Sequence, residues 1–353
     1  MGQNSFLGRN WKLIVNIATV AVLVLLVWLI RDQIIETFRN LGNVEWRVLF
    51  LILPLILASY HAQTRMYQQL FVLLGHRLHY RFLFRVSLEL NFVNQVFPSG
   101  GVSGISYFGL RLRSAEVTAT QASLVQLMKL FLLFVSFEVL LGAGVLTLAF
   151  EGKANHFMLL VAGSITTLLV VGTLALMTVI GSKRRTHAAF MAIARVINRI
   201  VRLFARRRTA IGAERVEQVV TDLHTSYKAM RAGHRKLLAP LFWALVVNAA
   251  AILSIYAVYV AFGQWVNLGA IIVSYSVANF AGLVSVLPGG AGIYEALMVG
   301  VLAAGGIPAA LSLPVTVMYR VLSTLIQLPP GYALYHQAVR RTGRNPLDQP
   351  HES

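Results

Sequence analysis

Long apolar runs alternate with short polar connections along most of this chain, a pattern that is typical of an all-α polytopic membrane bundle. About 18 to 20 consecutive apolar residues are enough for a helix to cross the hydrocarbon core of a bilayer. Six runs reach this length, and for each we predict a membrane-spanning helix: 13–30, 48–72, 119–150, 157–181, 240–262 and 311–335.

Two further apolar runs, 86–104 and 268–304, are interrupted near their middles by proline and glycine. Backbone groups freed by a broken helix cannot face lipid, and they are tolerated only where protein or a water-filled cavity satisfies them. We therefore predict that each run folds as a re-entrant helical hairpin, which enters and leaves the membrane on the same side.

Composition supports this class, since 57% of the residues are apolar and only 12% are charged, against about 25% charged residues in a soluble domain. The formal charge of +18 fits basic cytoplasmic connections. The distribution of Lys and Arg predicts that both termini are cytoplasmic, that 86–104 enters from the cytoplasm and that 268–304 enters from outside. We expect a multi-pass protein of the bacterial inner (plasma) membrane.

The connection 182–239 contains 14 of the 31 Lys and Arg residues. Part of it has the spacing of a basic amphipathic helix, which suits an anionic inner leaflet. An ordinary basic cytoplasmic loop and specific recruitment to lipid both remain open. Nucleic acid is not an expected partner, because no aromatic residues are interleaved with the basic ones.

The whole chain, 1–353, is predicted to be one membrane domain built from an inverted repeat, with 1–150 as the first half and 157–340 as the second, interrupted by 182–239. FVNQVFPSGGVSGISY matches FAGLVSVLPGGAGIYE around the two prolines, and SLVQLMKLF matches LPVTVMYRVL, which pairs Lys129 with Arg320. Inverted repeats with broken helices are a signature of transporters. Chance recurrence of short Gly/Pro motifs is the alternative.

The two breaks supply the first candidate site. In the second hairpin Pro288 ends one half-helix, Gly289, Gly290 and Gly292 permit a sharp turn, and the next half-helix directs free N–H groups and a positive dipole end at the turn. An anion such as a lipid phosphate suits this position. The partner turn of the first hairpin contains the following residues: Pro98, Gly100, Gly101 and Gly104. Hairpins that only pack against their neighbours are the alternative.

Ionisable residues inside apolar runs are costly and point to function. Glu295 follows the second break, and Arg320 lies deep in a predicted span, where it would pair with Glu295 or bind a lipid phosphate. Lys129 is either functional or directed towards the membrane surface. Arg111 and Arg113 follow the first hairpin.

Polar amides near the breaks have a more modest interpretation. Asn91 and Asn279 occupy matching places in the two hairpins, and they are expected to satisfy loosened backbone groups.

Motifs for chemistry are missing from the sequence. It has no cysteine, no H-E-x-x-H, no G-x-S-x-G and no Walker loop. We therefore expect no metal site, no cofactor and no catalytic set, and we do not expect an enzyme.

The stretch LPGGAGIYEALM (287–298), followed by VMYRVLSTLIQLPPG (317–331), resembles the lysylphosphatidylglycerol synthase transmembrane-region family, also called UPF0104-type membrane proteins. FPSGGVSG with Arg111 and Arg113 is similar to the family's first Pro-Gly motif. One departure is Ile105-Ser106-Tyr107, where many members have an acid and an arginine, so headgroup contacts at the first turn are expected to differ.

In the bifunctional members of that family, the membrane region precedes a cytosolic aminoacyl-transferase domain and is thought to flip the aminoacylated lipid. The resemblance implies lipid translocation without the synthase activity. We expect an anionic or polyprenyl-linked lipid as substrate. The alternatives are a non-catalytic membrane subunit that works with a soluble transferase, and a transporter of small solutes.

Overall fold

The computed structural model describes residues 44–96, 102–150, 156–182, 184–188, 234–284 and 292–342, with a few isolated positions elsewhere. These ranges contain helices and connections but no strand. The predicted span 13–30, the hairpin turns 97–101 and 285–291 and most of the basic connection 182–239 lie outside the described residues.

Four described segments are long and apolar enough to cross a membrane: Trp46–Leu73, Ala119–Phe150, Leu238–Ala261 and Ala309–Arg340. In the helix numbering these are α3 (Trp46–Leu49) with α4 (Ile52–Leu73), α7 (Ala119–Phe150), α11 (Leu238–Ala261) and α14 (Ala309–Thr342). Helix α8 (His156–Ile180) coincides with the predicted helix 157–181 to within one residue at each end. The prediction of an all-α polytopic fold is confirmed.

Both interrupted runs form helical hairpins. The first consists of α5 (Tyr80–Val96) and α6 (Val102–Leu112), and the second of α12 (Leu268–Val284) and α13 (Ile293–Ala304). The first is longer at both ends than the predicted 86–104, so Arg111, which was expected to follow the hairpin, lies within α6. Arg81 and Arg85 are exposed while Leu83 between them is fully buried. The start of α5 is therefore amphipathic, with its basic residues on the exposed face.

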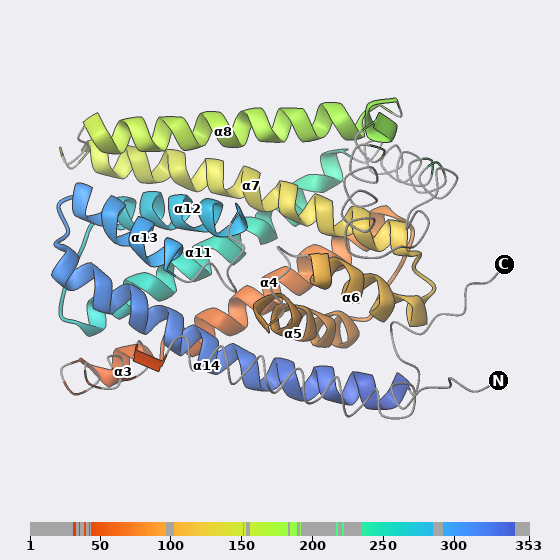
Figure 1. Ribbon diagram of the computed structural model, residues 1–353, viewed down its shortest axis with the longest axis horizontal. Helices are drawn as coiled ribbons and strands as arrows, with labels where there is room; N and C mark the ends of the chain where they lie inside the picture. Colours follow the sequence, from red (N-terminus) through yellow and green to blue (C-terminus); the bar gives the residue numbers. More distant parts are fainter. Residues whose placement is uncertain are drawn as a thin grey trace, which may run out of the picture.

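The two hairpins enter the bundle from opposite ends (Figure 1). The backbone N–H of Glu45, just before α3, donates to the carbonyl oxygen of Ala261 at the end of α11 (2.8 Å). The start of the α3–α4 segment and the end of α11 therefore share one end of the molecule. The first hairpin follows the far end of α4, where His76 Nε2 lies 3.2 Å from Gln121 Oε1 at the start of α7. The second hairpin follows α11 and so begins at the other end.

The packing exchanges elements between the two halves of the chain. Helix α7 packs on α12 of the second hairpin, and α14 packs on α5 of the first, while α4 and α11 lie against each other. Helices α7 and α14 also each contact the second arm of the hairpin that precedes them, α6 and α13 respectively. A twofold relation between the halves predicts this exchange, although the repeat itself stays a prediction.

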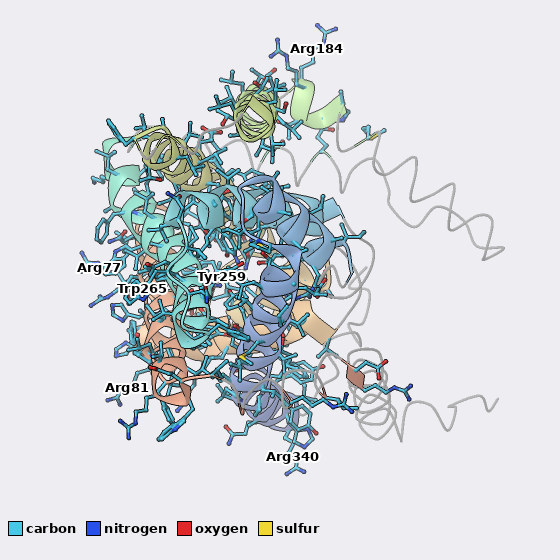
Figure 2. All side chains as sticks on the ribbon, turned by 90° about the vertical axis from the view of Figure 1, so that its left-hand side faces the viewer. Arg77, Arg81, Arg184, Tyr259, Trp265 and Arg340 are labelled. Atoms are coloured by element: carbon cyan, nitrogen blue, oxygen red, sulfur yellow. The ribbon has the colours of Figure 1, made fainter. Side chains whose placement is uncertain are left out.

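The exterior of the bundle is apolar along its length. Large apolar side chains such as Leu57, Val139 and Leu253 are exposed, as expected where lipid rather than water is the solvent. Seen from one end of the bundle, Arg184 and Arg340 project from its periphery, whereas Tyr259 lies inside (Figure 2).

Helices α7 and α12 approach closely at a glycine. A Cβ atom on Gly269 would lie 2.4 Å from the carbonyl oxygen of Gly144 and 2.4 Å from Thr147 Oγ1. The first of these is a backbone atom, so relief of the clash requires α12 to move away from α7.

We expect Gly269→Ala to lower the free energy of unfolding by about 1–3 kcal/mol, because an inserted methyl group forces packed helices apart. The unfolding temperature of the purified protein in detergent measures the effect. Gly142→Ala is the matched control, since Gly142 lies on α7 with nothing within 4 Å of its Cβ position, and alanine favours helix. Equal unfolding temperatures for the two variants would contradict the packing described here.

Candidate functional site

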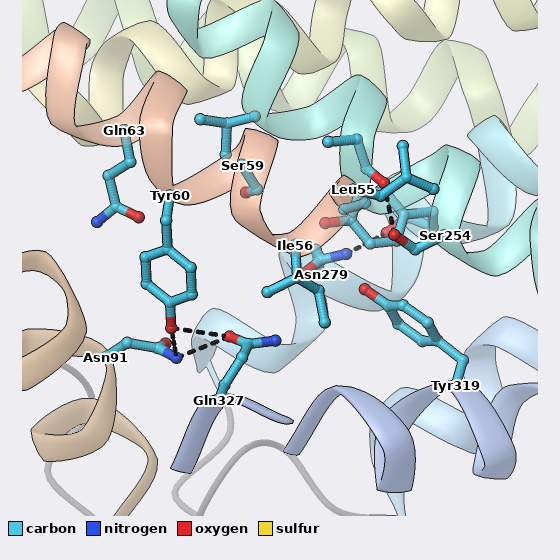
Figure 3. Close-up of a pocket in the computed structure, with 14 residues that line it drawn as sticks. Leu55, Ile56, Ser59, Tyr60, Gln63, Asn91, Ser254, Asn279, Tyr319 and Gln327 are labelled. Atoms are coloured by element: carbon cyan, nitrogen blue, oxygen red, sulfur yellow. Dashed lines mark hydrogen bonds between the residues drawn. The ribbon is translucent and has the colours of Figure 1, made fainter. Parts of the chain in front are cut away.

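A cavity of about 320 Å³ lies between α4, α5, α11, α12 and α14 (Figure 3). Its volume is at the lower end of the range of small-molecule sites, about 300–1,000 Å³. Its wall combines apolar side chains and tyrosines with hydroxyl and amide groups, and it has no charged residue among the described residues that line it. The hydroxyl and amide groups come from the following residues: Ser59, Tyr60, Gln63, Asn91, Ser254, Tyr275, Asn279, Tyr319 and Gln327.

Three of these side chains join three helices at one wall of the cavity. Asn91 Nδ2, on α5, donates to the hydroxyl oxygen of Tyr60 on α4 (2.6 Å) and to Gln327 Oε1 on α14 (2.8 Å). The Tyr60 hydroxyl in turn donates to Gln327 Oε1 (3.1 Å). This Tyr60–Asn91–Gln327 cluster connects the first hairpin to the last helix of the chain, as the dashed lines in Figure 3 show.

The second hairpin supplies part of the facing wall. Asn279 Nδ2 donates to the backbone carbonyl oxygen of Tyr275 on the same helix (2.9 Å). Tyr275 lies within the regular helix α12, so this bond does not test the expected role of Asn279 in satisfying backbone groups loosened by the break. Asn91 instead bonds to two side chains, so the two matching amides have different partners although both line the cavity.

Sequence reasoning missed Tyr60, Gln63 and Gln327. A signal for the first two was available, since Ser59, Tyr60 and Gln63 fall on one face of α4. Gln327 lies seven residues after Arg320, which is two helical turns along the same face. These polar positions inside predicted spans mark the cavity more directly than the charged residues do.

A buried ion pair lies beside the second hairpin. The Arg320 guanidinium on α14 donates through Nη1 to Oε1 of Glu295 on α13, and the Glu295 residue is 5% exposed. The sequence left pairing with Glu295 and binding of a lipid phosphate open for Arg320, and the structure shows the pairing. Arg320 also lies over the ring of Tyr294, with Cζ 5.0 Å from the ring centroid.

The start of α13 is closed by its own carboxylate. Glu295 Oε2 accepts the backbone N–H of Gly292 (2.7 Å), and Gly292 has a φ of 84°, a conformation that favours glycine. A carboxylate thus occupies the helix N-terminus at which the sequence predicted a lipid phosphate. Pro288, Gly289 and Gly290 of the same motif lie outside the described residues.

The first hairpin carries a second buried ion pair. Arg111 on α6 donates through Nε to Glu89 Oε2 (2.7 Å) and through Nη2 to Glu89 Oε1 (3.1 Å). The Tyr107 hydroxyl donates to Glu89 Oε2 (2.8 Å). Glu89 on α5 is only 1% exposed, so the bidentate pair fastens the two arms of the hairpin together. Arg113 is exposed.

The remaining candidates of the first hairpin are placed only in part. Gly104 permits a close approach to α5, since a Cβ atom there would lie 2.0 Å from Asn94 Oδ1. Pro98, Gly100 and Gly101 lie outside the described residues.

Lys129 is engaged inside the bundle. Its Nζ donates to the Tyr67 hydroxyl (3.2 Å) and lies 5.5 Å from the centre of that ring. None of the five charged candidates is among the described residues that line the cavity: Lys129, Arg111, Arg113, Glu295 and Arg320. Across the described part of the chain, no three His, Asp or Glu residues are grouped in a way that would hold a metal ion.

Comparison with known proteins agrees with this architecture. The family model for the lysylphosphatidylglycerol synthase TM region matches residues 15–331, which include both hairpins and every residue that lines the cavity. A UPF0104 membrane protein of Methanothermobacter thermautotrophicus is 35% identical over 71 residues, which are 20% of this chain and 21% of that protein. That pairwise match therefore spans about a fifth of either protein. The family match covers most of the chain, and the protein belongs to the lysylphosphatidylglycerol synthase TM-region family, whose members are membrane proteins linked to lipid modification and flipping.

Proposed function

We propose that this protein moves a lipid between the two leaflets of its membrane. The headgroup passes through the polar cavity while the hydrocarbon tails stay in the bilayer. One observation carries the proposal: hydroxyl and amide groups from both hairpins meet in a cavity inside a bundle whose exterior is apolar.

The energetic argument concerns desolvation. A polar headgroup that enters hydrocarbon loses its hydrogen bonds to water, at a cost of several kcal/mol for each unsatisfied group. A row of side-chain amides and hydroxyls replaces those bonds inside the bundle. Each of the two hairpins contributes such groups to the cavity, Asn91 from the first and Asn279 from the second.

We propose that the two buried ion pairs, here called latches, hold the hairpins in place. Arg320 ties α13 to α14 through Glu295, and Arg111 ties α6 to α5 through Glu89. Each latch holds a hairpin in the position that encloses the cavity.

For the orientation in the membrane and for the substrate we keep the predictions made from the sequence. The end of the bundle that carries Arg77, after α4, and Arg340, near the end of α14, faces the cytoplasm of a bacterial inner membrane, where the connection 182–239 contacts the anionic leaflet. The substrate is an anionic or polyprenyl-linked lipid.

Filling the cavity tests the proposal. We expect Ala251→Trp to reduce lipid translocation to the rate of empty vesicles, since Ala251 lines the cavity and the indole ring occupies the space a headgroup needs. The assay follows headgroup-labelled lipids in proteoliposomes with an impermeant quencher. Leu253→Trp is the matched control, because Leu253 lies on the same helix and is 42% exposed.

Wild type and Leu253→Trp should translocate equally. A wild-type rate equal to that of empty vesicles, across several lipid classes and with or without a proton gradient, would overturn the proposal. Full activity of Ala251→Trp would keep the function and remove the cavity from the route.

A second candidate function is a non-catalytic membrane subunit of a lipid-modifying system with a soluble transferase partner. The observation that favours it is the family match, which is to the membrane region of a synthase. Co-purification of a transferase, together with absence of translocation by the protein alone, would establish this second role.

A further inference from the structure

The wall of the cavity indicates which kind of headgroup it accepts. It offers amides, hydroxyls and tyrosine rings but no charged side chain among the described lining residues. A headgroup whose only polar part is a phosphate or an ammonium would place a buried charge without a partner in this cavity, which is strongly unfavourable. An anionic lipid that also carries hydroxyl groups can place those groups in the cavity and keep its charge outside. The nearby cation Arg320 is held by Glu295 and lies over the ring of Tyr294.

The amides of the cavity have hydrogen-bonding groups to spare. The bonds described for Gln327 use its Oε1 and those for Asn91 use its Nδ2. The bond of Asn279 uses its Nδ2. A side-chain amide has both a donor and an acceptor end, so Gln327 Nε2 and the Oδ1 atoms of the two asparagines can serve a ligand. These groups come from both hairpins and from α14 (Figure 3).

Tyrosine rings complete the wall, since Tyr60, Tyr275 and Tyr319 all line the cavity. Neutral ligands with many hydroxyl groups suit this combination, because their hydroxyls bond to amides while their C–H faces pack on aromatic rings. The volume of about 320 Å³ equals the liquid volume of about ten water molecules, which is room for a single sugar ring.

We propose that the cavity binds the uncharged, hydroxyl-rich part of a lipid headgroup, a sugar or polyol, and selects against headgroups whose only polar part is ionised. This inference rests on the proposed function for its setting, but it concerns binding and is tested without transport. Lipids with a sugar on diacylglycerol and lipids with a sugar on polyprenyl phosphate share the chemistry, so both are tested.

The experiment measures binding to the full chain in nanodiscs of phosphatidylcholine. Three probes are compared by native mass spectrometry: monoglucosyl diacylglycerol, a polyprenyl phosphoglucose and phosphatidic acid. We expect at least one sugar lipid to bind about tenfold more tightly than phosphatidic acid. The sugar lipid that binds shows whether the sugar is attached to diacylglycerol or to polyprenyl phosphate. Tighter or equal binding of phosphatidic acid would overturn the inference.

Variants locate the binding in the cavity. Gln327→Met should weaken binding of the sugar lipid about tenfold, the effect of losing one hydrogen bond, and should leave binding of phosphatidic acid unchanged. Gln126→Met is the matched control, since Gln126 accepts a bond from Tyr67 outside the cavity lining. If Gln327→Met does not fold, Asn279→Leu tests the opposite wall, because the one bond described for Asn279 lies within its own helix.

Unchanged sugar binding in a folded cavity variant would also overturn the inference. Sugar lipid that binds but is not translocated would leave the inference standing and count against the proposed function. Translocation of phosphatidic acid, without any preference for sugar lipids in binding, would support the proposed function and overturn the inference.

Discussion

Replacement of Arg111 by glutamine should lower the free energy of unfolding by about 3–5 kcal/mol, the usual cost of removing one partner from a buried ion pair. Glu89 would keep the bond from the Tyr107 hydroxyl but lose both bonds from the guanidinium. Its carboxylate is 1% exposed, so water cannot replace them. Unfolding in detergent, followed by circular dichroism against temperature or denaturant, measures the loss.

The double variant Glu89→Gln/Arg111→Gln is the informative control, because it removes the charge that the single variant leaves buried. It should recover more than half of the lost stability. Arg113→Gln should change nothing measurable, since Arg113 is an exposed arginine of the same segment. A double variant as unstable as Arg111→Gln would show that packing of the long side chains, rather than charge, holds the hairpin.

Replacement of Arg320 by glutamine should cost a similar free energy of unfolding, about 3–5 kcal/mol, and should also abolish translocation. Glu295 would retain only the backbone N–H of Gly292 among the partners described above, and α13 would lose its tie to α14. Stability in detergent and translocation in proteoliposomes are measured on the same preparation, at a temperature at which the variant is folded.

The double variant Glu295→Gln/Arg320→Gln separates structure from gating. It should recover most of the stability but not the translocation, because neutral amides pair without the charge that holds the hairpin closed. Recovery of both properties would show that the ion pair only positions α13 and has no part in transport.

The sequence predicted the spans well where hydropathy alone decides them. The predicted 119–150 coincides with α7, and the second hairpin was bounded correctly at 268–304. Both predicted bounds of the first hairpin were wrong, since its helices run from Tyr80 to Leu112 and include the basic residues Arg81, Arg85 and Arg111. The number of charged residues in a stretch does not show whether they lie on the exposed face of a helix or in a loop.

The sequence offered the ion pair of the second hairpin as one of two alternatives for Arg320, and the structure shows it. Glu295 and Arg320 are the ionisable residues of two consecutive apolar segments, and pairing lowers the cost of burying such charges. The cavity was not predictable, because Tyr60 and Gln327 are 267 positions apart and only the crossing of α4, α5 and α14 brings them together. Hydropathy identifies apolar segments but does not specify how they cross.

The exchange of helices between the halves has a consequence for biogenesis. When residues up to 150 have been inserted, α5 has no α14 to cover it, and Asn91 and Tyr60 lack the Gln327 oxygen that later accepts from both. Nearly two hundred further residues must be synthesised before α14 reaches the membrane. During that interval Asn91 can still donate to Tyr60, but the face of α5 that α14 later covers is open, so we expect the nascent first half to depend on membrane chaperones more than the finished protein does.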